Sequence, residues 1–307
     1  HLSCEANESI TIENPFVVDE KHEYSIVVTF EKDGHEYAHE QYVYPYQREE
    51  HHVWTPLSIN EDYLNVGVSF EGGNVIFSKS KGLVSYKVHS HEFIRMPVRP
   101  NFFRAATNND VDYGQWLQNS LYAKCKYINT VKEENRCIVS YEYALPSMED
   151  HPLHMNYEVY GDGEIVVDMY LDAFENHIEM PVFGILLQTY TDLDEVSYYG
   201  NGPEENYIDR KKGAVLGKYT YNVKENLTPY LYPQECGNRT DMRELNVHSD
   251  RHALLIQGNL FECSVLPYSP FVLENAKHQW ELPQVYETVL SINEKQMGIA
   301  GDNTWGA

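Results

Sequence analysis

The sequence is poor in cysteine and in positive charge. Its 307 residues include five cysteines, at positions 4, 125, 137, 236 and 263, and none forms a CxxC pair. An odd number without metal-type spacing is typical of a reducing compartment rather than of a disulfide framework. Lys and Arg number 23 against 47 Asp and Glu, for a formal net charge of -24. Such an acidic surface repels polyanions, so we expect neither nucleic acid nor an anionic membrane as a partner.

Several targeting and catalytic signals are also missing. No apolar run approaches the ~20 residues of a membrane span, and no secretory signal peptide is visible. We therefore expect a bacterial cytoplasmic protein, with secretion before trimming left open, because the chain starts at His1 rather than at a Met. No GxSxG elbow occurs, and the glycine-rich pieces lack a P-loop lysine.

One short stretch imitates a zinc motif. "HEYAH", from His35 to His39, matches the HExxH pattern of metalloproteases. That chemistry requires a helix, which brings the two histidines onto one face a single turn apart. Here the motif follows a hairpin turn, and a strand would hold the two histidines roughly 13 Å apart. We therefore expect no metal site in this stretch.

What the sequence has in abundance is tyrosine and strand-like alternation. It contains 25 Tyr and 13% aromatic residues, which favour pleated sheets and sugar-binding surfaces. Runs of period-two alternation end repeatedly at turn residues, as in antiparallel hairpins. These turns are Asp33-Gly34, Gly72-Gly73, Lys81-Gly82 and Gly161-Asp162-Gly163. We predict an all-β protein with one short helix, from about Tyr113 to Ala123.

Three stretches combine turn residues, charge and aromatic rings. The first is "RPNFFRAATNNDVDYG", residues 99–114, in which Arg104 precedes the polar cluster Asn108-Asn109-Asp110. Such a loop can hydrogen-bond a hydroxyl-rich ligand or simply cap its own turns.

The second stretch is "YYGNGPEENYIDRKKG", residues 198–213. Its paired Glu204 and Glu205 suggest glycoside cleavage, where two carboxyl groups about 5 Å apart give retention. Adjacent strand residues point to opposite faces, however, so these two cannot flank one bond. An ion pair between Arg210 and either Asp209 or a glutamate is the better interpretation.

The third stretch is "TPYLYPQECGNRTDMRELNV", residues 228–247. Its charged residues alternate in sign, and buried ion pairing between long turns explains them as well as catalysis does. They are Glu235, Arg239, Arg243 and Glu244.

These stretches, with "FSKSKGLVSY" and the terminal "GIAGDNTW", resemble the C-terminal region of glycoside hydrolase family two β-galactosidases. The match runs in order over nearly all of residues 53–307. The resemblance implies a large antiparallel β-supersandwich, similar to galactose mutarotase, over residues 56–307. A linker at 47–55 would join it to residues 1–46, which resemble part of an immunoglobulin-like β-sandwich. Since the family continues past the tryptophan turn, we expect the chain to be cut at both ends.

The resemblance also implies that catalysis and substrate support lie in different parts of the enzyme. Family members hydrolyse terminal β-galactosides such as lactose with retention, using two glutamates on a TIM barrel that also binds magnesium and sodium. The barrel is absent here, so we expect no catalytic residue, metal ligand or cofactor in this chain. Trp305 would give the sugar an aromatic platform, and Asn108, Asn109 and Asp110 would form a mobile rim of the active site.

Other motif residues would have supporting, structural roles. They are Arg104, Gly202, Pro203, Glu205, Asn206, Tyr207, Asp209, Arg210, Glu235, Arg243 and Glu244. Two positions depart from the family pattern. Asn108 stands where Asp is usual and Cys236 where Asn is common, which changes local hydrogen bonding.

Our main interpretation is a C-terminal portion of a β-galactosidase that walls the galactoside pocket, supports a homo-oligomer of the full enzyme and is inactive alone. A natural small subunit of a two-chain β-galactosidase is the first alternative. A stand-alone aldose epimerase would need a histidine base facing a carboxylate. A galactose-binding module without chemistry is the last alternative.

Overall fold

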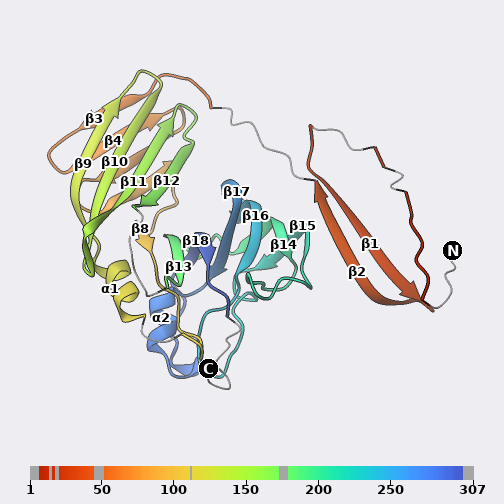
Figure 1. Cartoon of the computed structure of the whole chain (residues 1–307). Helices are drawn as coiled ribbons and strands as arrows, with labels where there is room; N and C mark the ends of the chain where they lie inside the picture. Colours follow the sequence, from red (N-terminus) through yellow and green to blue (C-terminus); the bar gives the residue numbers. More distant parts are fainter. Residues whose placement is uncertain are drawn as a thin grey trace. The chain divides into compact units, whose positions relative to one another are not determined.

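The chain divides into two compact units, His1–His51 and His52–Ala307 (Figure 1). The computed structural model describes residues 7–13, 16–17, 21–44, 52–110, 113–172 and 179–299. The division falls inside the stretch 47–55 that the sequence suggests as a linker. That the first unit belongs to an immunoglobulin-like sandwich stays a prediction.

The first unit contains one hairpin, formed by β1 (Tyr24–Lys32) and β2 (His35–Tyr44). Its turn has left-handed backbone angles at Asp33 (φ 55°) and Gly34 (φ 76°), as the Asp-Gly signal predicts. The HEYAH stretch lies in β2, so its histidines are on a strand and not on a helix. Phe30 is 61% exposed, and no described residue of this unit is buried. The hairpin therefore brings no core of its own.

The second unit begins with two sheets that face each other. The five-stranded sheet contains β3 (Ser58–Glu61), β4 (Asn65–Phe70), β5 (Gly73–Ser78), β6 (Gly82–Val88) and β7 (His91–Glu92). The four-stranded sheet contains β9 (Lys124–Lys132), β10 (Arg136–Leu145), β11 (Met148–Tyr160) and β12 (Ile165–Leu171).

Aromatic side chains join these two layers. The Phe77 and Tyr157 ring centroids are 5.2 Å apart, and the Tyr141 hydroxyl donates to the Ser78 carbonyl at 2.9 Å. Burial along β10 alternates strictly, so that every second side chain enters the core. Gly163 has no room for a side chain, because a Cβ there would lie 2.5 Å from the Phe70 ring.

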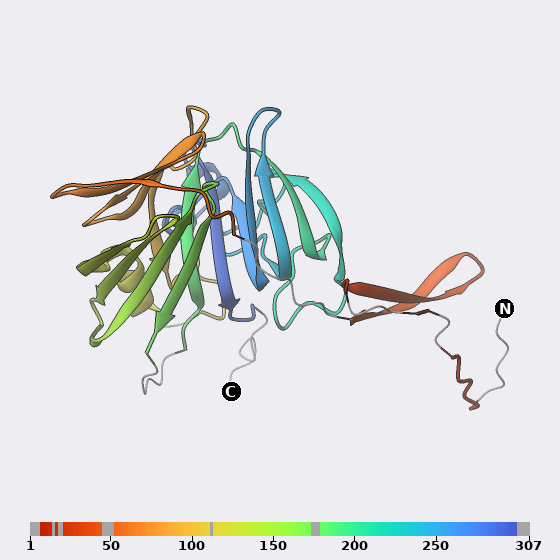
Figure 2. The same ribbon diagram turned by 90° about the horizontal axis from the view of Figure 1, so that it is seen from above.

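A seven-stranded antiparallel sheet completes this unit, in the order β15-β14-β16-β17-β18-β13-β8. In Figure 2 its cyan and blue strands lie beside the orange and yellow-green layers. Its strands are β8 (Met96–Asn101), β13 (Val182–Thr189), β14 (Glu195–Gly202), β15 (Val215–Asn222), β16 (Arg239–His248), β17 (Ala253–Leu266) and β18 (Thr288–Gln296). One continuous hydrophobic core includes side chains from all three sheets of the unit.

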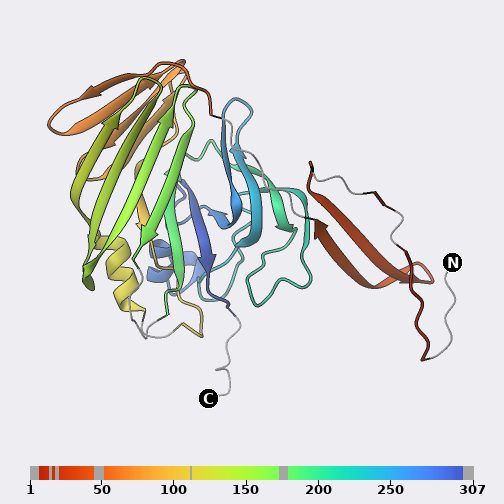
Figure 3. The same ribbon diagram turned by 45° about the horizontal axis from the view of Figure 1, so that its top comes forward.

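Helices are short and few in the described residues. They are α1 (Gly114–Tyr122), α2 (Pro270–Asn275) and the 3-10 turn η1 (Gln279–Glu281). The two α-helices lie at the same end of the second unit (Figure 3). α1 confirms the helix predicted from 113 to 123, and its Trp116 is fully buried, with Nε1 donating to the Glu179 carbonyl at 2.8 Å. The predicted fold class, all-β with antiparallel sheets, is confirmed.

Two further observations concern the cysteines and the lengths of the helices. The four cysteines in the described part, at 125, 137, 236 and 263, are all free. Within the same residues, neither helix has the length and hydropathy of a membrane span.

Removing the first unit tests where the stability of the chain resides. A single hairpin is marginal in water, whereas the second unit has its own core. We expect a chain shortened to residues 52–307 to melt within about 2 °C of the full chain, measured by circular dichroism. A fall of more than about 5 °C, equivalent to more than about 1 kcal/mol, would contradict this.

Candidate functional site

The sheet brings two distant segments of the chain to one end. β8 and β18 both pair antiparallel with β13, and Gly184 of β13 faces Asn101 of β8 and Asn293 of β18. These two strands therefore run in the same direction and end near each other. The loop 102–110 that follows β8 and the segment 297–299 that follows β18 consequently leave the sheet together.

Three side chains hold the main chain of residues 297–299. Arg104 donates from Nη1 to the Met297 carbonyl at 2.6 Å and from Nη2 to the Gly298 carbonyl at 2.8 Å. Asn109 donates from Nδ2 to the Ile299 carbonyl at 2.7 Å. Asp209 accepts from the Ile299 amide at 3.3 Å. We call Arg104, Asn109 and Asp209 the 297–299 clamp.

One clamp residue, Arg104, also forms a buried ion pair with Asp110. Arg104 donates to Asp110 from Nε at 3.0 Å and from Nη2 at 2.7 Å, and both side chains are only 2% exposed. Burial alone would lower the pKa of Arg104, but the hydrogen bonds and charge of Asp110 raise it. Asp110 also accepts from the Thr107 amide at 2.9 Å. The loop 107–110 is thereby fixed to Arg104, while Asn108 is exposed.

Residues of the second stretch pack beside the clamp. A Cβ on Gly202 would collide with the Tyr198 hydroxyl, and a cis peptide bond joins Gly202 to Pro203. Asn206 is 2% exposed. Its Oδ1 accepts from the Thr240 amide at 2.9 Å, and its Nδ2 donates to the Asn201 carbonyl at 3.0 Å. This asparagine therefore ties the 203–210 loop to the start of β16.

Glu205 is a half-buried carboxylate of the same region. It accepts from the Gly237 amide at 2.7 Å, the Tyr230 hydroxyl at 2.9 Å and Arg210 Nη2 at 2.6 Å. Burial would raise its pKa, but these donors lower it. Glu204 is exposed. The ion-pair partner of Arg210 is therefore Glu205, while Asp209 accepts a hydrogen bond from the Ile299 amide as part of the clamp.

Glu235 has a contrasting environment. It is 8% exposed, and its Oε1 lies 3.4 Å from the Tyr207 hydroxyl. Burial raises the pKa of Glu235 to about 7, helped by the charges of Glu205 and Asp110 and opposed by Gln296 and Arg104. Burial also raises the pKa of Tyr207 well above its usual value.

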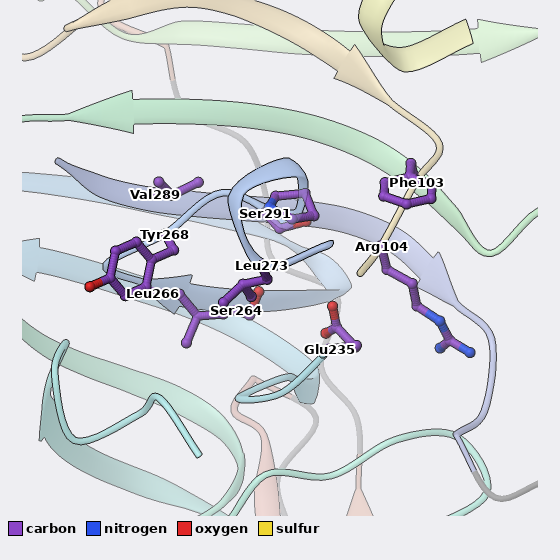
Figure 4. A pocket seen from close by; sticks show the side chains of 10 residues that line it. Phe103, Arg104, Glu235, Ser264, Leu266, Tyr268, Leu273, Val289 and Ser291 are labelled. Atoms are coloured by element: carbon purple, nitrogen blue, oxygen red, sulfur yellow. The ribbon is translucent and has the colours of Figure 1, made fainter. Parts of the chain in front are cut away.

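Glu235 and Arg104 line a small cavity (Figure 4). In that view Phe103 and Arg104 lie toward one end and Tyr268 toward the other. The centre of a water-sized sphere can move within about 10 Å³ of this cavity, which is close to the minimum needed to hold one water molecule. A sugar ring does not fit in it.

The third stretch contributes two arginines that lie over tyrosine rings. Arg239 is 6% exposed and donates to the Tyr198 hydroxyl at 3.1 Å and the Gly237 carbonyl at 3.2 Å. The guanidinium of Arg243 lies 5.7 Å from the Tyr199 ring centroid. Glu244 is exposed and accepts from Gln257 at 3.0 Å. The hydrogen bonds of Arg239 are to neutral oxygens, unlike the buried ion pairing between turns that the sequence suggests.

Sequence reasoning names the clamp side chains but misses what they bind. Their targets are main-chain atoms of Met297, Gly298 and Ile299, which carry no sequence signature. A Cβ on Gly298 would lie 2.5 Å from Cγ of Asp209, so the glycine is the one available signal. Trp305 lies outside the described residues.

Known proteins resemble the chain over most of its length. Residues 70–307 match the family described as Beta galactosidase small chain. The chain is 37% identical over 292 residues to a protein of Priestia megaterium and 34% identical over 284 residues to one of Streptococcus thermophilus. A protein of Halalkalibacterium halodurans is 33% identical over 289 residues. All three are named Beta-galactosidase.

These alignments cover most of this chain but only a small part of each relative. Each covers 89% of this chain but 28% of the relative, so the chain spans just over a quarter of the length of these proteins. The family match covers more than three quarters of the chain and includes every clamp residue. The chain belongs to the β-galactosidase small chain family.

Proposed function

We propose that this chain is the C-terminal part of a retaining β-galactosidase that hydrolyses terminal β-D-galactosides. In this proposal it supplies one wall of the active site, and the catalytic glutamates lie in the remainder of the enzyme. The observation that carries the proposal is the 297–299 clamp, which fixes the chain six residues before Trp305.

The carboxylates near the clamp support a wall rather than a catalytic centre. Glu205 is occupied by four donors, including Arg210 at 2.6 Å. Glu235 has a pKa of about 7, as a general acid would, but its cavity admits no sugar. A retaining glycosidase needs two carboxyl groups about 5 Å apart on a reachable bond. We therefore propose that the chain alone does not hydrolyse galactosides.

Trp305 has the chemistry that a galactoside wall needs. The C–H-rich face of a pyranose packs on an aromatic ring, while its hydroxyl groups keep hydrogen-bond partners at the rim. The amides and carboxylates of Asn108, Asn109 and Asp110 supply such polar groups. Asn109 binds the segment that leads to Trp305, which supports a common place for rim and platform.

We place the family's magnesium and sodium in the rest of the enzyme. Magnesium prefers several oxygen ligands around one point. Across the ranges that the structure describes, no three His, Cys, Asp or Glu side chains gather in this way. The donor set of the described residues therefore does not fit such a metal, and no step is assigned to one. A homo-oligomer of the whole enzyme is part of the same proposal.

The matching family favours one second candidate, a separately encoded small chain of a two-chain enzyme. Its description, Beta galactosidase small chain, supports this arrangement. Co-expression of the chain with a separate barrel-containing large chain distinguishes the two. Activity that requires both polypeptides supports the two-chain form, whereas an uninterrupted reading frame through both parts supports a single enzyme.

A chimaera tests the proposed function. Replacing the aligned 28% of the Priestia megaterium β-galactosidase by this chain should give turnover of a chromogenic β-galactoside, whereas the chain alone should give none. Trp305→Ala in the chimaera should lower kcat/KM by about 10- to 100-fold, since burying an aromatic face contributes about 1.5–3 kcal/mol. Trp280→Ala, at a 75% exposed tryptophan, is the matched control. Equal kcat/KM values for the parent and Trp305→Ala chimaeras would refute the proposed role of Trp305 in the wall of the active site.

Stability of the chain as a function of pH tests the buried state of Glu235. Its pKa rises from 4.5 in the unfolded chain to about 7 in the folded one. The folded state therefore binds more protons between these values, and its stability falls as pH rises through that window. Glu235→Gln should abolish this fall, giving a gain over the parent of up to about 3 kcal/mol at pH 8 and a smaller one at pH 5. Urea unfolding measures it, with the exposed Glu244→Gln as control. A gain that is the same at both pH values would show that Glu235 does not titrate in this range.

A further inference from the structure

We propose that the cavity between Glu235, Ser264 and Ser291 is a binding site for one internal water molecule. This water would join the segment that precedes β16 to strands β17 and β18 of the seven-stranded sheet. Its role does not depend on the proposed function, because it would be the same whatever reaction the whole enzyme catalyses.

One side of the cavity is the face of the seven-stranded sheet that points away from the main core. The main core takes Cys263 and Val265 of β17. Because side chains alternate along a strand, Ser264 points to the opposite face. Ser264 faces Ser291 of β18 across the antiparallel ladder, which places the two Cβ atoms on one face roughly 5 Å apart. The sheet therefore presents two neighbouring hydroxyl groups to the cavity.

Glu235 lies over this face from the segment before β16. Its amide donates to the Ala105 carbonyl at 3.1 Å, which ties the segment to the loop after β8. In the view of Figure 4 the Glu235 carboxyl stands between Ser264 and Arg104. Most of the other residues that line the cavity are apolar, among them Leu266, Leu273 and Val289. The polar groups are thus gathered between Glu235 and the two serines.

These polar groups lack hydrogen-bond partners. Ser264 is 5% exposed, and its hydroxyl has no hydrogen-bond partner among the described residues. The Glu235 carboxyl accepts one long hydrogen bond, from the Tyr207 hydroxyl at 3.4 Å. Gln296 opposes the rise in the pKa of Glu235, but its buried Nε2 meets no acceptor in hydrogen-bond geometry within the described ranges. Buried polar groups are rarely left in this state, and ordered water commonly completes them.

Size and chemistry select water over other occupants. The centre of a water-sized sphere can move within only about 10 Å³, so a larger molecule does not fit. Cavities that stay empty are apolar, whereas this one has two hydroxyl groups and a carboxyl group. A hard cation takes six or more oxygen ligands, more than these three side chains offer. An anion would be repelled by the carboxylate of Glu235.

A single water molecule can satisfy all three groups at once. The Ser291 hydroxyl donates to Asn293 Oδ1 at 3.1 Å, so its oxygen is left to act as an acceptor. The water therefore accepts from the Ser264 hydroxyl and donates to Ser291 Oγ and to the Glu235 carboxyl. Three hydrogen bonds are the usual number for a buried water molecule.

Water also suits both protonation states of Glu235. With a pKa of about 7, this carboxyl changes charge near neutral pH. A water molecule has two protons and two lone pairs, so it donates to the ionised carboxylate and accepts from the protonated acid. Its removal would take a donor from the charged form, which raises the pKa of Glu235 further.

Magnetic relaxation dispersion of water oxygen counts the long-lived internal water molecules of the full 307-residue chain. Ser264→Val and Ser264→Thr both add bulk to the cavity, and Ser264→Thr also keeps the hydroxyl group. We expect each variant to hold one water molecule fewer than the parent. The matched control is Ser140→Val, at a half-buried serine of β10 in the four-stranded sheet, which should lose none.

Two further measurements place the water at this site. A crystal structure of the parent should show one water within hydrogen-bond distance of Ser264, Ser291 and Glu235, and Ser264→Thr should lack it. Carbon NMR of the glutamate carboxyl groups, assigned with Glu235→Gln, should show Glu235 as about a tenfold weaker acid in Ser264→Thr. Because that variant keeps the serine hydroxyl, the change reports the lost water. Ser140→Val should leave the titration of Glu235 unchanged.

The outcomes that overturn the proposal are distinct from those that support it. Equal water counts in the parent and in the folded Ser264 variants would do so, as would an empty cavity in the parent crystal. Sodium NMR relaxation that is enhanced by the parent and not by Ser264→Thr would show a sodium ion in place of water. If Ser264→Val does not fold, Ser264→Thr and the parent crystal carry the test, because the threonine differs from the serine by one methyl group.

Discussion

The buried ion pair between Arg104 and Asp110 is the contact on which the candidate site depends. Taking two charges out of water costs several kcal/mol per ion, and the cost is offset only when the remaining donors also find partners. Here they do, since the guanidinium meets the carbonyls of Met297 and Gly298 as well as the carboxylate. The pair thus constrains the loop after β8 and the segment after β18 at the same time. Loss of either partner would leave an unmatched charge in the interior.

One half-buried and one buried glutamate near this pair show that burial alone does not decide a pKa. Burial raises both, yet the pKa of Glu205 is lowered and that of Glu235 reaches about 7. The two differ in burial and in donors: the half-buried Glu205 accepts from an amide, a hydroxyl and an arginine within 2.9 Å, whereas the more deeply buried Glu235 has the hydroxyl of Tyr207 at 3.4 Å. A perturbed carboxyl in a protein of this family is therefore no sign of catalysis unless substrate can reach it.

Much of the fold could be predicted from the sequence, because turns and strands depend on residues that are close together in the chain. The Asp33-Gly34 turn, the glycine turns and the alternation along β10 depend on neighbouring residues and on the pleat. The partners of the clamp could not be predicted in this way. Asp209 meets the amide of Ile299, 90 residues away, and the place of β8 beside β13 sets which loops meet. Such contacts depend on strand order, which no short stretch specifies. Arg210 could equally have paired with Asp209 until the structure assigned Glu205 to it.

Under the proposed function, the clamp would let a β-sandwich portion contribute to a site that it does not complete. The chain spans 28% of the length of its relatives, so in the proposed enzyme most of the active site would come from the other part. Ordering one residue of backbone costs about 1–2 kcal/mol. With Met297, Gly298 and Ile299 already fixed, about 3–6 kcal/mol of ordering belongs to folding and not to substrate binding. Under the proposed function, that part of the ordering would not reduce the affinity of the enzyme for a galactoside.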